Sequence, residues 1–196
     1  MDDLELMDLF PQFVSNPTAL ENEDPAARMT RALQDRERLQ EIAALRLTEP
    51  DVEHILQDVC REASNAMGLP IGLVTIVLDE AQHFAAQHGL GGWLHEAGGT
   101  PVEWSFCRFT VAEKSAFVVE DAGRNQKVKS NPLVTQDGLR CYAGMPLITS
   151  RGHAVGSLCV AGVEAREFSE RDLATLQRYT AEAMRRIETR RVELRP

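Results

Sequence analysis

The hydrophobic positions change period along the chain, and the first period is helical. Between residues 25 and 47, apolar side chains such as Leu39 and Ile42 recur three to four positions apart. Asp24 can act as an N-cap, and Pro25 suits the first helical turn. The pattern therefore predicts one helix over residues 25–47.

Two further segments carry helical patterns. The first begins at Pro50, with Thr48 as the expected N-cap, and ends near Gly68, a common signal for a helix C-terminus. The second covers residues 168–194, where Ser169 is the expected N-cap and carboxylates occupy the first turn. The chain should therefore end in a long helix.

Between these helices the apolar positions follow the pattern of extended chain. Segments rich in β-branched and aromatic residues predict strands over residues 69–79, 83–89, 116–122, 139–149 and 153–162. Residues 89–101 and 123–138 are expected to be loops, the second with a helical turn, and a short helix is expected within 103–115. Short turns join successive strands at two points, so the sheet should be mostly antiparallel.

The order of these elements predicts an α+β fold. We expect a central antiparallel β-sheet of five to six strands flanked by helices, with long N- and C-terminal helices packing together. The expected divisions are an acidic, partly apolar tail (1–24), an N-terminal helix (25–47), the main domain with its C-terminal helix (48–190) and a short tail (191–196).

The C-terminal helix carries apolar positions at alternating spacings of three and four. Such a seam is typical of helices that pair in a coiled coil, and it predicts a homodimer through the terminal helices. The alternative is that the seam covers the protein's own sheet. The seam consists of Leu173, Leu176, Thr180, Ala183, Ile187 and Leu194.

The predicted strand around "RCYAGMPLI" contains two residues that strands tolerate poorly. Gly144 and Pro146 lie two positions apart, in the same segment as Tyr142. Such residues mark a β-bulge or a close approach of another group. We expect one of these two irregularities in this strand.

Composition and charge exclude several classes of protein. Hydrophobic content is 43% of the 196 residues, charged content is 26%, and the net charge is −9. No apolar run approaches the length of a membrane span, and the acidic N-terminus does not resemble a targeting signal, so a cytoplasmic location is expected. The cations cluster near the end of a helix, where they complement its dipole, so nucleic-acid binding is not expected.

The acidic first 24 residues also contain several apolar side chains. Acidic and hydrophobic residues in mixture are typical of segments that dock on a partner protein. Folding back onto the domain is the alternative, since an apolar cluster is costly to leave in water. The sequence leaves both open.

The residue patterns resemble those of GAF domains, which sense small molecules in bacterial signalling proteins. The resemblance covers residues 35–187 and is most specific in Tyr142-Ala-Gly-x-Pro-Leu, followed by Gly156-x-Leu-Cys-Val. It implies a central antiparallel sheet with helices on one face that form a dimer surface. It also implies a ligand pocket on the other face, and leaves the ligand open.

The pocket implied by this resemblance should be lined by loop segments and by strand positions that face it. Aromatic and methionine side chains with a few polar groups are typical of such sites. Arg124 could pair with an anionic ligand or with Asp121, and Asp121 could accept a hydrogen bond from an amine. The expected ligand-binding residues are Trp104, Phe106, Cys107, Phe109, Asp121, Arg124, Leu133, Tyr142 and Met145.

Other GAF subtypes gain less support from the residues. No cysteine precedes a histidine, as a bilin attachment site usually requires, and His83 and His88 are only isolated candidates for a haem ligand. The signature of the cyclic-nucleotide subgroup is not recognisable, and no cysteine pattern indicates a zinc site. We therefore expect no cofactor and no metal.

An enzymatic alternative rests on the thiols. One GAF-fold enzyme reduces free methionine sulfoxide, and Cys107 is similar in position to one of its cysteines. Cys107 and Cys141 are expected to be able to face one pocket, which keeps this enzyme as the main alternative. The acids which that enzyme carries on its last two strands are replaced here by Cys159 and Ala161. The favoured interpretation is a non-enzymatic sensory or adaptor module that binds a small molecule or a partner protein; thiol-dependent reduction through Cys107 is the alternative.

Overall fold

A six-stranded antiparallel sheet forms the centre of the protein. The computed structural model describes residues 24–193, and the order of strands across the sheet is β3-β2-β1-β6-β5-β4. The strands are β1 (Ile71–Val77), β2 (Ala81–His88), β3 (Gly99–Pro101), β4 (Phe117–Val119), β5 (Cys141–Ile148) and β6 (Ala154–Gly162). The α+β prediction with an antiparallel sheet of five to six strands is confirmed.

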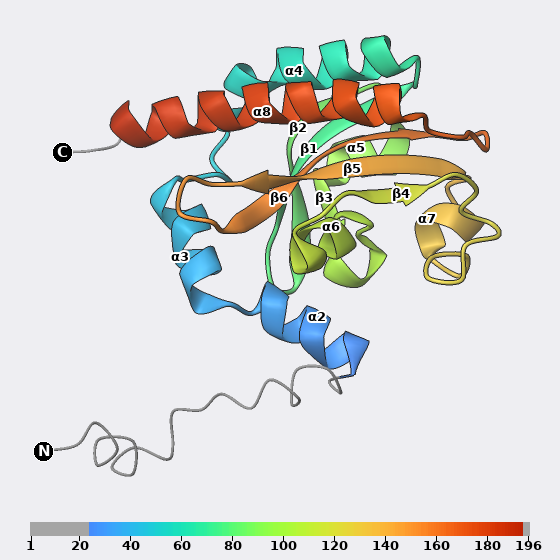
Figure 1. Cartoon of the computed structure of the whole chain (residues 1–196), viewed down its shortest axis with the longest axis horizontal. Coiled ribbons are helices and arrows are strands. Elements are labelled where there is room, and N and C mark those ends of the chain that lie inside the picture. The colour runs from blue at the N-terminus through green and yellow to red at the C-terminus, as the bar shows by residue number, and fades with distance from the viewer. Residues whose placement is uncertain (1–23, 194–196) are drawn as a thin grey trace, which may run out of the picture.

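Two long helices lie side by side across one face of this sheet (Figure 1). They are α4 (Asp51–Met67) and α8 (Glu170–Glu193). The opposite face carries α6 (Cys107–Glu113), with α5 (Gly92–Ala97), the 3₁₀ turn η1 (Val102–Trp104) and α7 (Pro132–Thr135) in the connecting segments. The two faces are therefore covered differently, by long helices on one and by short helices and loops on the other.

The segment expected to be one N-terminal helix forms two. Asp24 caps α2 (Pro25–Leu33) by accepting from the amide of Ala26, as predicted. The helix then stops, because Asp35 accepts from the amide of Arg38 and begins α3 (Arg36–Ala44). In Figure 1, α2 lies beside α6. The helix that packs along the C-terminal helix α8 is α4.

The ends of the other helices follow local signals. Gly68 ends α4 in the left-handed conformation, with φ of 60°, as its position predicts. Thr48 does not cap this helix, because Pro50 occupies the N-cap position without a side-chain hydrogen bond. Ser169 and Asp172 cap α8 reciprocally, through the amide of each residue and the side chain of the other.

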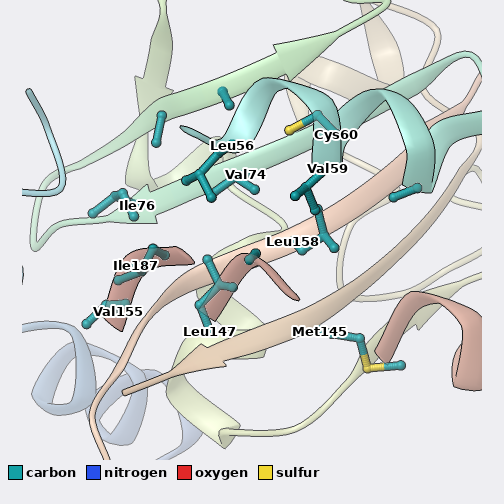
Figure 2. Close-up of a cluster of buried hydrophobic side chains, with 14 of the residues drawn as sticks. Leu56, Val59, Cys60, Val74, Ile76, Met145, Leu147, Val155, Leu158 and Ile187 are labelled. Atoms are coloured by element: carbon teal, nitrogen blue, oxygen red, sulfur yellow. The ribbon is translucent and has the colours of Figure 1, made fainter. Parts of the chain in front are cut away.

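A hydrophobic cluster between the sheet and the two long helices forms the larger core (Figure 2). Its members include Leu56 of α4, Val74 of β1, Leu158 of β6 and Ile187 of α8. The four described seam residues from Leu176 to Ile187 are all buried in α8. The seam therefore covers the protein's own sheet, and a homodimer would have to use another surface.

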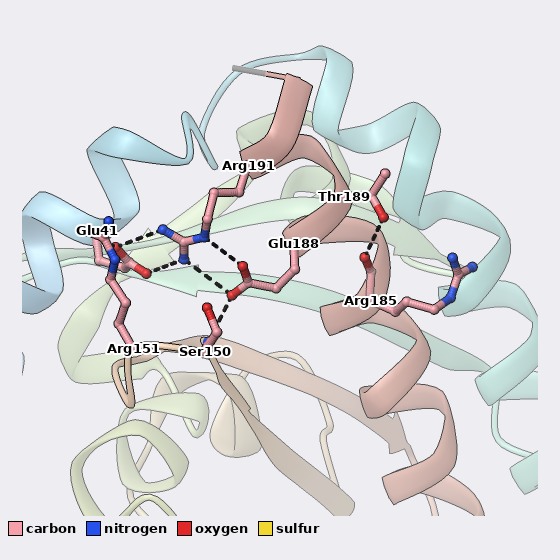
Figure 3. A network of polar contacts seen from close by, with 7 residues as sticks. All are labelled: Glu41, Ser150, Arg151, Arg185, Glu188, Thr189 and Arg191. Atoms are coloured by element: carbon pink, nitrogen blue, oxygen red, sulfur yellow. Dashed lines mark hydrogen bonds and ion pairs between the residues drawn. The ribbon is translucent and has the colours of Figure 1, made fainter. Parts of the chain in front are cut away.

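A polar network holds the C-terminal half of α8 to two other elements (Figure 3). The guanidinium of Arg191 donates to Glu41 of α3 and to Glu188 one turn earlier in α8. Glu188 also accepts from the amide of Ser150, in the β5–β6 hairpin, at 2.8 Å. The Glu41 side chain is 2% exposed, so Arg191 neutralises a carboxylate that is almost fully buried.

Among residues 24–193, no helix is long and apolar enough to cross a membrane. The acidic segment expected to dock or fold back lies outside the described residues, as does Leu194 of the predicted seam. The short tail expected from residue 191 begins inside α8, which continues to Glu193.

Candidate functional site

A cavity of about 90 Å³ lies on the face of the sheet opposite α4 and α8. Its base is formed by strands β1, β2, β5 and β6, and α6 covers one side of it. Its walls are mostly apolar. The lining residues are Ile71, Leu73, Gln82, Phe84, Leu90, Leu94, Phe106, Cys107, Leu133, Asp137, Leu139, Tyr142, Cys159, Ala161 and Val163.

Two thiols and a phenol meet at the inner wall of this cavity. Sγ of Cys107, at the start of α6, lies 3.8 Å from Sγ of Cys159 on β6. The hydroxyl of Tyr142, on β5, donates to Cys107 at 3.2 Å. Each of the two cysteines is 2% exposed. These three groups give an otherwise apolar wall a local site for hydrogen bonding and for thiol chemistry.

The backbone of β5 explains how Tyr142 reaches Cys107. A Cβ atom placed on Gly144 would lie 2.2 Å from the Tyr142 hydroxyl and 2.9 Å from Oγ of Ser157. Glycine at this position leaves room for the phenol to lie along its own strand. The expected close approach is therefore at Gly144, whereas the shift in strand register falls later, between Leu147 and Ile148.

Among the described strands, Pro146 lies in a part of β5 that pairs with β6 on one side and with no strand on the other. Strand β4 pairs only with the residues from Tyr142 to Gly144, so Pro146 lies beyond the end of β4. A proline is tolerated where a strand has no partner on one side.

The surroundings of the thiols separate their pKa values. Burial would raise the pKa of Cys107, but hydrogen bonding by Cys159, Thr75, Tyr142 and Ser157 lowers this pKa to about 7. The pKa of Cys159 is raised well above its usual range, first by its hydrogen bond to Cys107 and then by burial. Cys107 is therefore the thiol of the pair that ionises first.

Two connecting segments form the mouth of the cavity. Leu90 and Leu94 come from the segment around α5, and Leu139 comes from the segment after α7. The indole Nε1 of Trp93 donates to Oδ1 of Asp137 at 2.7 Å and so joins the two segments. Because Trp93 is 45% exposed, this hydrogen bond is at the surface and can open without disturbing the core.

Polar groups on β2 are held in position beside the cavity. The hydroxyl of Ser105 donates to Oε1 of Gln82, a buried residue of the lining. Because its oxygen already accepts from Ser105, Gln82 can offer its NH₂ group as a hydrogen-bond donor to another group.

Four of the nine expected ligand-binding residues line the cavity: Phe106, Cys107, Leu133 and Tyr142. The ring of Phe106 packs on Tyr142 with 5.3 Å between centroids. Their placement together agrees with the expected location of a pocket on this face. Whether they bind a ligand stays a prediction.

The other five lie elsewhere. Met145 packs in the core beneath α8, because alternate residues of β5 point to opposite faces of the sheet. Phe109 stacks on Phe117, with 4.7 Å between centroids, outside the cavity. Trp104 packs edge-on against Trp93, at 6.0 Å.

Asp121 and Arg124 belong to a surface turn. The carboxylate of Asp121 accepts from the amide of Gly123 at 3.0 Å, and the amide of Arg124 bonds the Asp121 carbonyl. Within the described residues the two side chains form no ion pair, and Arg124 is exposed. The expected pairing of Arg124 with either Asp121 or a ligand in this cavity has no geometric support.

The sequence interpretation missed the residues of the cavity mouth. Residues 89–101 were expected to be a loop, because their glycines outnumber their apolar residues. In fact this segment forms α5 and β3, and Gly98 ends the helix in the left-handed conformation. Leu94 lies in α5 and Leu90 lies two residues before that helix, so helical spacing could not have placed both at the mouth.

The lining also limits what the cavity can hold. Among the described residues that line it, Asp137 is the one charged side chain, and there is no Lys, Arg or His. Neither His83 nor His88 borders the cavity, so the isolated haem candidates find no support there. No cluster of three or more metal-binding side chains occurs within residues 24–193.

Comparison with known proteins matches most of the chain to one family. The model of the GAF domain family matches residues 51–187. "Cyclic di-GMP phosphodiesterase PA2567" of Pseudomonas aeruginosa is 34% identical over 149 residues, which make up 75% of this chain and 24% of that protein. The chain therefore spans about a quarter of the length of this relative.

Solved structures share the fold at low sequence identity. The GAF domain of a phosphoenolpyruvate-protein phosphotransferase from Coxiella burnetii is 19% identical, with a TM-score of 0.59; the match covers 87% of this chain and 98% of that one. The free methionine-R-sulfoxide reductase from Neisseria meningitidis is 18% identical, also with a TM-score of 0.59, over 87% of this chain and 95% of that one. These similarities concern the fold alone.

Proposed function

The chain belongs to the GAF domain family, and on that premise we propose that it is a non-enzymatic sensory module. Its cavity binds a small, uncharged and largely apolar molecule. The observation that carries this proposal is a preformed cavity whose inner wall is apolar except for Tyr142, Gln82 and the two thiols. A few polar groups in an apolar lining are typical of sites that fix the orientation of a small ligand.

The size and charge of the cavity narrow the class of ligand. Its volume of about 90 Å³ is smaller than the ~150 Å³ apolar cavity that holds benzene. A ligand with one aromatic ring must therefore widen the mouth or protrude through it. Because the lining offers no cation, a phosphate or carboxylate group would be buried without a partner, which argues against nucleotides.

The fold provides a direct route from the cavity to the long helices. Leu73 of β1 and Cys159 of β6 face the cavity, whereas their neighbours Val74 and Leu158 face the core beneath α4 and α8. A displacement of either strand by a ligand therefore moves the packing surface of both helices. We infer that α4 and α8 pass the signal to an output domain or a partner protein.

A homodimer remains part of the proposal, but its surface changes. Since the α8 seam is buried, the dimer we propose uses the outer, polar surfaces of α4 and α8. Sedimentation analysis at tens of micromolar (an order of magnitude suited to specific interfaces) tests it. A strict monomer at that concentration would remove the dimer from the proposal.

A thiol-dependent reductase of free methionine sulfoxide is the second candidate function. The proximity of Cys107 and Cys159 favours it, because such an enzyme needs a nucleophilic thiol and a second thiol to resolve the product. The lining opposes it, because the described residues around the cavity offer no cation for the carboxylate of a free amino acid. Turnover of methionine sulfoxide with dithiothreitol, abolished by Cys107→Ser, would establish the enzyme; no turnover would exclude it.

Native mass spectrometry of the freshly purified full chain tests the sensory proposal. A bound small molecule should appear as a mass increment that disappears after denaturation. Ala161→Leu, which fills the cavity, should lose the increment, whereas Ala174→Leu on the exposed surface of α8 should retain it. An increment that survives in Ala161→Leu would place the ligand elsewhere and contradict the proposal.

A further inference from the structure

The chain has four cysteines, and their environments differ sharply. All four are buried, but only Cys107 and Cys159 line the cavity. Cys60 belongs to α4 and lies in the core on the other side of the sheet, where burial raises its pKa to about 12. Burial also raises the pKa of Cys141. The two cavity thiols are thus the pair that small molecules can reach.

The cavity thiols also have a geometry suited to reaction with each other. Their sulfur atoms are 3.8 Å apart, whereas a disulfide requires about 2.05 Å. A displacement of roughly 2 Å at the start of α6 would close this gap. Cys107 follows the turn η1 and begins a short helix, so the displacement need not disturb the paired strands.

A route from solvent leads to these thiols. The lining includes Val163, which is 60% exposed, and the mouth is held by the surface hydrogen bond between Trp93 and Asp137. Small uncharged oxidants can therefore enter. The apolar walls favour oxidants that carry an organic group over ionic ones.

From this geometry we propose that Cys107 and Cys159 form an oxidation-sensitive pair, which an organic hydroperoxide that enters the cavity converts to a disulfide. The resulting cross-link ties the start of α6 to β6 and changes the shape of the cavity. The proposal shares the cavity with the sensory function, but it rests on the thiols and does not require that any ligand binds.

The reaction has two balanced steps. The thiolate of Cys107 attacks the terminal oxygen of the hydroperoxide, so an S–O bond forms, the O–O bond breaks, and the alkoxide leaves as alcohol after taking up the proton released by the thiol. Cys159 then attacks the sulfur of the sulfenic acid; the S–S bond forms, and hydroxide leaves as water with the proton of Cys159. The two thiols lose two electrons, and the hydroperoxide gains them.

Tyr142 is a positioning residue for the first step. Its hydroxyl donates to Cys107 at 3.2 Å and so stabilises the thiolate that attacks. Removal of this hydroxyl should slow oxidation without removing either thiol. A purely structural role of Tyr142 would leave the pH dependence of oxidation unchanged.

The experiment treats the full chain with tert-butyl hydroperoxide, a small aliphatic hydroperoxide, and follows the intact mass and the disulfide peptides. The expected product has lost two hydrogens and links Cys107 to Cys159. Cys60→Ser and Cys141→Ser are the matched controls, since both thiols lie outside the cavity, and both variants should oxidise at the rate of the parent chain. Cys159→Ser should stop at a sulfenic acid that dimedone traps on Cys107.

Tyr142→Phe should oxidise several-fold more slowly at neutral pH and regain part of the rate at higher pH, where more of Cys107 is ionised. Circular dichroism confirms that each variant is folded. A folded parent chain that keeps four free thiols after treatment, or a disulfide that involves Cys60 or Cys141, overturns the proposal. Disulfide formation in a protein whose cavity binds no small uncharged ligand in solution would leave the oxidation proposal intact and refute the sensory proposal, so the two failures are distinguishable.

Discussion

The hydroxyl of Tyr142 lies along its own strand, over Gly144, and ends 3.2 Å from Sγ of Cys107. This contact joins β5 to α6 across the inner wall of the cavity. The contact requires that residue 144 has no side chain. Gly144 therefore allows Tyr142 to reach Cys107, which lies 37 positions before Gly144 in the sequence. The next two predictions follow from this contact.

Gly144→Ala should displace the phenol. The added Cβ would lie 2.2 Å from the Tyr142 hydroxyl and 2.9 Å from Ser157. Forcing a methyl group into packed space lowers the free energy of unfolding by about 1–3 kcal/mol. Urea unfolding measures this loss. The control is Gly91→Ala, where no atom lies within 4 Å and φ is negative, and its stability should remain close to that of the parent chain.

Ionisation of Cys107 should have a midpoint near pH 7. Hydrogen-bond donors stabilise the thiolate, so the thiolate fraction rises through this pH, which is lower than for an ordinary thiol. The ultraviolet absorbance of thiolate, taken as the difference between the parent chain and Cys107→Ser, measures the midpoint. Tyr142→Phe removes a donor and should raise it. An unchanged midpoint in this variant would show that the phenol does not stabilise the charge.

Trp93→Phe should loosen the mouth of the cavity. The variant keeps an aromatic ring but cannot donate to Asp137, and loss of this exposed hydrogen bond should cost about 1 kcal/mol or less. Amide hydrogen exchange should become faster in residues 89–98 and 131–140 together. Asp137→Asn retains an acceptor oxygen and is the matched control. Faster exchange in only one of the two segments would contradict the idea that this bond joins them.

Arg191→Ala should destabilise the protein by about 2–3 kcal/mol. It leaves the buried Glu41 without its principal partner, although Arg151 remains at 3.4 Å and moderates the loss. Chemical unfolding measures the change. Arg185→Ala removes an exposed arginine of the same helix and should cost about 0.5 kcal/mol or less. Equal losses in the two variants would contradict the role assigned to burial.

The same network predicts a dependence of stability on acid. The guanidinium of Arg191, whose hydrogen bond is the largest influence, lowers the pKa of Glu188 to about 2. A carboxyl with a lowered folded-state pKa contributes stability that is complete above its usual pKa of about 4.3 and is lost as the pH falls toward 2. The free energy of unfolding should fall in this window for the parent chain. In Arg191→Ala the fall should be shallower; an identical pH profile would argue against this coupling.

The sheet and its helices could be predicted because their signals are local. The apolar runs gave the strands around Val74 and Leu158, and Asp24, Gly68 and Ser169 marked helix ends through their own side chains or backbone. The break after Leu33 was missed because Pro25 and the apolar period suggested one continuous helix. Asp35 is a second N-cap, and it starts a new helix although the apolar spacing continues.

The cavity could be predicted only in part, because its walls are assembled from distant segments. The pattern of β5 identified Tyr142 but did not reveal which of its alternate positions faces the helices, so Met145 was expected in the wrong layer. Cys159 was noted only as a replacement for an acid. Cys159 lies close to Cys107 because α6 packs over β6. The two cysteines are 52 positions apart in the sequence, so no local pattern could reveal this contact.

Binding of phenol to the full chain tests the central claim most directly. Phenol is uncharged and largely apolar, and its hydroxyl can pair with Gln82 or Tyr142; a ligand of this size should bind with a dissociation constant on the order of 1 mM. A two-dimensional amide NMR titration should shift the signals of residues that line the cavity in the parent chain and in Ala174→Leu, but not in Ala161→Leu. Benzoate, which carries a charge that the cavity cannot pair, should cause no such shifts. Shifts that persist in Ala161→Leu, or that benzoate reproduces, would contradict the claim that this cavity is a site for small uncharged molecules.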